Sequence, residues 1–131
     1  MGVLTVYLDK IINLVDTDFF GKADPYVKFH VEQDNWVFDK TFGRVTSSKK
    51  KEQLNPVYHE EFTFDVPSLK NLVLRVKVMD DDILFDDKMG SCSIKLDELG
   101  LGEEPLGVER VIDRNLIAKD ARLFLRLSYK E

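Results

Sequence analysis

Hydrophobic and polar residues alternate with a period of two along most of this 131-residue chain. Every second position is apolar in six stretches, at residues 3–8, 26–31, 61–66, 72–78, 92–96 and 123–129. In the second stretch, Val27, Phe29 and Val31 share one face. Tyr26 and Lys28 fall on the opposite face. Because this alternation is typical of antiparallel strands with one buried face, we predict a strand in each stretch.

Two further strands are predicted where the alternation is weaker. One runs from about Trp36 to Ser48, with an interruption near Gly43, and the other covers 108–112. The connection at 97–107 is predicted to hold one helical turn. Eight strands of this kind predict an all-β fold, an antiparallel sandwich of two sheets. The length of the chain favours one stand-alone domain, residues 1–131.

Charge and composition exclude several classes of protein. The 24 acidic residues outnumber the 19 basic ones, and the resulting net charge of −5 argues against a nucleic-acid binder. No apolar run approaches the roughly 20 residues of a membrane-spanning helix, and the N-terminus lacks the features of a secretory signal. The single cysteine, Cys92, excludes an internal disulfide. We therefore expect a cytoplasmic protein in which Cys92 is buried and inert.

Two acidic stretches are candidates for function, DTDFFGKAD at 16–24 and DDDILFDD at 80–87. Loops of a sandwich gather at its two ends, where binding residues are common. Clustered aspartates without Cys or His are hard oxygen ligands, which suit calcium or magnesium rather than zinc. An EF-hand starting at Asp80 is excluded, because Phe85 and Ser91 replace its glycine and glutamate. Two solvated acidic turns remain the alternative interpretation.

Four segments, in order along the chain, are similar to the C2-domain family of calcium- and phospholipid-binding modules: FFGKADPYVKF, LNPVYHEEFTF, VMDDD and DDKMGSCSIKL. The resemblance covers essentially the whole chain. It implies an eight-stranded β-sandwich that binds calcium between loops at one end. The family occurs in two circularly permuted forms. The strand GVLTVYL comes first here, and this implies the phospholipase-like, type II order.

The resemblance also implies a set of metal ligands for two or more calcium ions. The first loop matches at Asp18 and Asp24, and the second at Asp80, at Asp82 and at the backbone carbonyl of Asp81. Either Asp86 or Asp87 closes the site, because this loop is shorter than in much of the family. Asp16 is interpreted as a solvated neighbour. Glu52 lies where some members supply a further ligand.

An electrostatic switch follows from this ligand set. Without calcium the acidic loops are repelled by an anionic phospholipid surface, and bound cations remove that repulsion. Five apolar residues at the loop tips are predicted to enter the bilayer: Phe19, Phe20, Ile83, Leu84 and Phe85. The alternative is that these side chains fold back over the loop bases. We thus expect a peripheral protein that is recruited to membranes when calcium rises.

Basic residues offer a second mode of membrane binding. Some relatives bind phosphoinositide headgroups on a basic face of one sheet, and the candidate contacts here are Lys28, Arg44, Lys49, Lys50 and Lys51. A solvated lysine run is the alternative interpretation.

Two rival functions differ in class from calcium-dependent membrane binding. One is a calcium-independent protein-interaction domain, against which the retained aspartates count. The other is a metal-dependent hydrolase. The sequence contains no P-loop, G-x-S-x-G or HExxH motif, and both His30 and His59 are interpreted as structural. We therefore predict that the chain is not an enzyme.

Replacing Leu84 and Phe85 with alanine tests the insertion hypothesis. Calcium affinity in solution should stay nearly unchanged, while binding to anionic vesicles should fall sharply. The reason is that burial of one such side chain contributes about 1.5–3 kcal/mol. Co-sedimentation with vesicles at saturating calcium measures the effect, and unimpaired binding by the double variant would contradict insertion.

Overall fold

The alternating stretches form strands in the computed structural model, which describes residues 1–14, 23–34, 40–81, 87–112 and 121–131. Within these residues the chain has eight strands and one short 3-10 helix. The strands are β1 (Gly2–Ile12), β2 (Pro25–Gln33), β3 (Lys40–Thr46), β4 (Val57–Val66), β5 (Leu72–Asp80), β6 (Asp87–Lys95), β7 (Leu106–Val111) and β8 (Arg122–Lys130). The helix, η1 (Leu96–Glu98), is the helical turn expected after β6. No helix of the described part is long and apolar enough to cross a bilayer.

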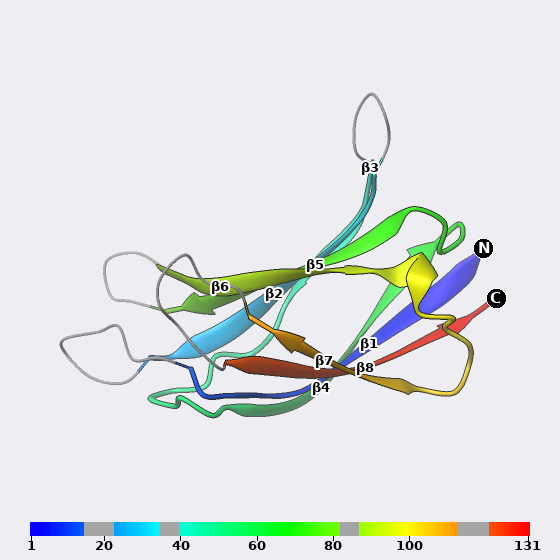
Figure 1. The fold of residues 1–131 in the computed structure, drawn as a ribbon. Helices are drawn as coiled ribbons and strands as arrows, with labels where there is room; N and C mark the ends of the chain where they lie inside the picture. Colours follow the sequence, from blue (N-terminus) through cyan, green and yellow to red (C-terminus); the bar gives the residue numbers. More distant parts are fainter. Residues whose placement is uncertain (15–22, 35–39, 82–86, 113–120) are drawn as a thin grey trace.

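The strands form two antiparallel sheets that face each other (Figure 1). Sheet A has the order β4-β1-β8-β7, and sheet B has the order β3-β2-β5-β6. The last strand, β8, pairs with both β1 and β7. The strand GVLTVYL, predicted to come first in the phospholipase-like form, is β1, the first strand of the described residues. Both chain ends lie at the end of the sandwich opposite to the end where β5 finishes and β6 begins (Figure 1).

The core is built from the predicted apolar faces of both sheets. Leu4, Val6 and Leu8 of β1 are fully buried, as are the alternate apolar residues of β5 and β8. Phe29 of β2 is 1% exposed, and its ring lies 5.5 Å from that of Phe62 on β4. This aromatic contact joins the two sheets, because β2 belongs to sheet B and β4 to sheet A.

The weaker strands differ from the prediction at their ends. The strand expected to continue to Ser48 ends at Thr46, and positions 36–39 lie outside the described residues. The predicted interruption at Gly43 is confirmed, because the pairing with β2 shifts by one residue there. A Cβ at Gly43 would also lie 2.9 Å from Cδ1 of Phe64, so the two sheets approach closely at this glycine. The strand predicted at 108–112 runs from Leu106 to Val111.

Two residues are buried to a different extent than their place in the pattern predicts. Tyr26, expected on the polar face of its strand, is only 3% exposed. The ammonium of Lys49 lies 5.3 Å from the centre of its ring and covers it. Cys92, expected to be buried, is half-buried. Burial still raises its pKa to about 11, so the thiol is protonated and unreactive at neutral pH.

Replacing Phe29 with alanine should lower the free energy of unfolding by about 3–5 kcal/mol, because the aromatic contact between the sheets is lost and a cavity remains. Urea unfolding measures the change. Thr63→Ala, an exposed substitution next to the partner Phe62, serves as control and should change stability by about 0.5 kcal/mol or less. A loss below about 1 kcal/mol for Phe29→Ala would show that the contact does not hold the sheets together.

Candidate metal centre

Two of the predicted ligands meet where β2 begins and β5 ends. In the pairing of these strands, Pro25 lies opposite Asp80, and Asp80 lies opposite Asp87 in the pairing of β5 with β6. Asp24 directly precedes β2, so the same register places it opposite Asp81 and next to Asp80. Asp24 and Asp80, which belong to acidic stretches far apart in the sequence, therefore lie side by side at one end of sheet B.

Main-chain hydrogen bonds hold Asp24 and Asp80 together. The amide N–H of Asp24 donates to Oδ1 of Asp80 over 2.9 Å, and the N–H of Asp81 donates to the Asp24 carbonyl over 3.1 Å. Asp80 is only 4% exposed. A buried carboxylate is costly unless it is hydrogen-bonded or paired with a cation. Asp80 thus has the environment of an oriented ligand carboxylate.

Asp24 is oriented in turn by the segment that connects β3 to β4. The amide N–H of Glu52 donates to Oδ1 of Asp24 over 2.7 Å. Glu52 adopts a left-handed backbone with φ of 53°, and the next residue, Gln53, donates its N–H to the Ala23 carbonyl over 2.9 Å. The sequence suggested the side chain of Glu52 as a ligand. That suggestion stays a prediction. The backbone of Glu52 supports a predicted ligand, a role for which the sequence carries no signal.

One residue of the lysine run, Lys49, contacts the acidic residue that follows Asp80. Nζ of Lys49 is 3.2 Å from Oδ1 of Asp81, and both side chains are partly exposed. Nζ of Lys50 lies 5.7 Å from the centre of the Tyr58 ring. The hydroxyl of Tyr58 donates to the Pro25 carbonyl over 2.7 Å, and burial raises the pKa of this hydroxyl above its usual value.

The oxygen chemistry of Asp24, Asp80 and Asp81 fits a hard divalent cation such as calcium. Within the described ranges, no group of three or more His, Cys, Asp or Glu is placed to hold a metal. The remaining predicted ligands Asp18, Asp82 and Asp86, with the side chain of Asp87, lie outside the described part of the chain. The predicted membrane-inserting residues Phe19, Phe20, Ile83, Leu84 and Phe85 also lie outside it.

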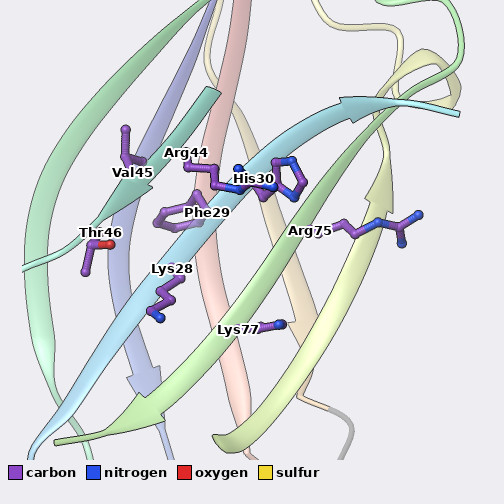
Figure 2. A pocket seen from close by; sticks show the side chains of 8 residues that line it. All are labelled: Lys28, Phe29, His30, Arg44, Val45, Thr46, Arg75 and Lys77. Atoms are coloured by element: carbon purple, nitrogen blue, oxygen red, sulfur yellow. The ribbon is translucent and has the colours of Figure 1, made fainter. Parts of the chain in front are cut away.

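A basic groove of about 400 Å³ lies on sheet B, lined by residues of β2, β3 and β5 (Figure 2). The groove contains two rows of residues, and each row runs across β3, β2 and β5 through directly paired positions. The rows are Thr46–Lys28–Lys77 and Arg44–His30–Arg75. The sequence pointed to Lys28 and Arg44. The sequence analysis did not name Arg75 and Lys77, although both occupy the polar face of a strand with regular alternation. The predicted contacts Lys49, Lys50 and Lys51 are not among the residues that line this groove.

The charges of the groove are compensated unevenly. Arg75 is held by Glu32, by Ser93 and by Oδ1 of Asp34 at 3.3 Å. Among the described residues, no carboxylate forms an ion pair with Lys28, Arg44 or Lys77. Like charges on neighbouring strands repel each other, so this arrangement favours an anion.

His30 in the same groove is mostly neutral at pH 7. Partial burial lowers its pKa, and the nearby charge of Arg44 lowers it further, while Glu32 acts in the opposite direction. Its Nε2 lies 3.0 Å from the Thr41 hydroxyl. His59 lies elsewhere, on the outer face of sheet A, where Nε2 is 3.1 Å from Oδ1 of Asp9.

Known proteins are similar to this chain over most of its length. The family model for the C2 domain matches residues 2–111. Synaptotagmin-9 of Rattus norvegicus is 37% identical over 106 residues, which are 79% of this chain and 21% of that protein. Tricalbin-1 of Saccharomyces cerevisiae is 33% identical over 99 residues, 75% of this chain and 8% of that protein. The chain thus spans about a fifth or less of the length of these relatives.

Solved structures show the same architecture. A C2 domain of plant Extended Synaptotagmin 1 superposes with a TM-score of 0.82 at 27% identity, over 98% of this chain and 94% of that one. A calcium-bound pair of C2 domains from Extended-Synaptotagmin 2 gives a TM-score of 0.74 at 26% identity, over 98% of this chain and 45% of that one. Human GIVD cytosolic phospholipase A2 is similar in fold alone, with a TM-score of 0.80 at 21% identity, over 99% of this chain and 17% of that one.

Proposed function

Because this chain belongs to the C2-domain family, we propose that it binds phospholipid membranes in a calcium-dependent manner through its acidic loops. The observation that carries this function is the pairing of Asp24 with Asp80, two aspartates whose carboxylates each accept a main-chain N–H. Calcium in the similar structure of Extended-Synaptotagmin 2 supports the choice of ion.

The carboxylates of Asp24 and Asp80 would hold the ion together with Asp18, Asp82 and one of Asp86 and Asp87. Hydrogen bonds from the amides of Asp24 and Glu52 orient the first two carboxylates before any ion arrives. Oxygen ligands from two loops suit calcium, which accepts six to eight oxygens in flexible geometry, and leave room for two ions. Each ion would supply positive charge where the acidic loops otherwise repel anionic lipid.

The net charge of −5 makes this dependence on cations physically reasonable. In the absence of calcium, the acidic loops and an anionic leaflet repel each other within roughly one Debye length, about 8 Å at physiological salt. With calcium bound, the loops can approach the lipid phosphates, and apolar side chains at their tips can then contact the bilayer. We propose that recruitment is peripheral and that the chain acts by binding rather than by catalysis.

Asp80→Asn tests the metal centre. It should weaken calcium binding by at least about tenfold, since a charged ligand is lost, and reduce calcium-dependent vesicle binding in parallel. The fold should persist, because the amide oxygen of Asn can still accept the N–H of Asp24. Calorimetric titration and co-sedimentation with anionic vesicles measure both effects.

Asp97→Asn is the matched control. Asp97 also accepts a main-chain N–H, from Asn71 over 3.0 Å. It belongs to η1 and lies beside the beginning of β5, whereas Asp80 is at the other end of that strand. This variant should bind calcium and vesicles as the wild type does. If the wild type binds no calcium up to millimolar concentrations, or if Asp80→Asn binds it normally, the proposed metal centre is wrong.

A second candidate function is calcium-independent binding of a phosphoinositide headgroup in the basic groove. Lys28, Lys77 and Arg44 support it, because none of these residues forms an ion pair within the described part of the chain. A multiply charged phosphate group would offset their mutual repulsion.

The double variant Lys28→Gln/Lys77→Gln tests this second function. In calcium-free buffer it should bind phosphoinositide-containing vesicles about thirtyfold more weakly, since each of the two basic residues near an anionic surface contributes about 1 kcal/mol. Lys51→Gln/Lys95→Gln removes the same charge outside the groove and should have little effect. Equal losses for both double variants would show that the overall charge of the chain, and not a specific site in the groove, accounts for the binding.

A further inference from the structure

Lys49 connects the basic run to the acidic loops. Its ammonium lies 3.2 Å from the carboxylate of Asp81 and 5.3 Å from the centre of the Tyr26 ring. Three segments therefore meet at this side chain: the connection from β3 to β4, the beginning of β2 and the end of β5. Asp81 stands between Asp80 and Asp82 in the sequence, in the middle of the acidic run.

The backbone holds Lys49 at this place. On one side, Ser47 donates its N–H to the Val27 carbonyl over 2.8 Å, and its Oγ accepts the Val27 N–H over 2.8 Å. On the other side, the N–H of Lys50 donates to the Pro25 carbonyl over 3.0 Å. Because β2 holds the backbone on both sides of Lys49, the backbone of Lys49 stays at a place from which its side chain reaches Asp81.

The ion pair has a consequence for any cation at the acidic loops. Without a divalent ion, the ammonium offsets part of the repulsion among neighbouring aspartates. A divalent ion at the same loops would be repelled by the ammonium, and its charge would weaken the hold of Asp81 on Lys49. Lys49 and a bound cation would therefore compete for the acidic residues around Asp81.

We propose that Lys49 is a tethered counter-ion that competes with calcium for the acidic edge at Asp81. It stabilises the loop bases when the ion is absent and lowers the affinity of the centre for the ion. This inference rests on the proposed calcium-dependent function, and it assigns to Lys49 the task of setting the calcium concentration at which the loops respond.

Calorimetric calcium titrations of the whole chain, without lipid, test the competition. Lys49→Gln should raise calcium affinity by about two- to fivefold at low salt, the scale of one partly exposed ion pair, and the gain should shrink at high salt. Lys49→Arg keeps the charge and should bind calcium as the wild type does. Lys51→Gln removes one charge from the same run, where no ion pair is formed within the described part of the chain, and should have a smaller effect.

Coupling to Asp81 separates a specific contact from general electrostatics. In an Asp81→Asn background, Lys49→Gln should raise affinity no more than Lys51→Gln does, because the shared partner is gone. Without calcium, Lys49→Gln should also lower the melting temperature, whereas Lys51→Gln should not. If the wild type binds calcium but Lys49→Gln and Lys51→Gln behave alike, the counter-ion role is wrong and the metal centre stands. If the wild type binds no calcium, the proposed function itself fails.

Discussion

The antiparallel pairing of β2 with β5 is the constraint on which both candidate surfaces depend. At its end, the pairing of Pro25 with Asp80 brings Asp24 beside the buried carboxylate of Asp80. In its middle, the same register places Lys28 opposite Lys77. Successive side chains of a strand point to opposite faces, so a slip by one residue would turn the basic side chains into the core. One set of backbone hydrogen bonds therefore defines an acidic end and a basic face.

The connection between β3 and β4 adds the second set of restraints at the acidic end. Its amides bond to β2 and to the residues just before it, and the N–H of Glu52 reaches the carboxylate of Asp24. Main-chain N–H groups thus orient the carboxylates of both Asp24 and Asp80. The same connection carries Lys49 and Lys50, whose ammonium groups lie over the rings of Tyr26 and Tyr58. Positive charge is thus kept close to the acidic residues without entering the core.

The two candidate surfaces carry opposite charge. In the proposed function, the acidic end would need a bound cation before it approaches anionic lipid, because the chain as a whole is negative. The basic groove on sheet B requires none, since Lys28, Arg44 and Lys77 already favour an anion. Membership of the C2 family is compatible with either contact. In the two proposed functions, calcium would control the acidic end, whereas the basic groove would bind its anion without calcium.

The sequence alone determined the strands, the sandwich and the chemical type of the acidic loops. These are local properties, because alternation records which side of a strand is buried and clustered aspartates select hard cations whatever the fold around them. The tertiary structure decided the partners. Arg75 and Lys77 join Lys28 and Arg44 through the register of β5 against β2, Lys49 meets Asp81 across a distant connection, and Glu52 acts through a backbone N–H. Such contacts depend on long-range pairing and on the main chain, neither of which is visible in the identity of a single residue.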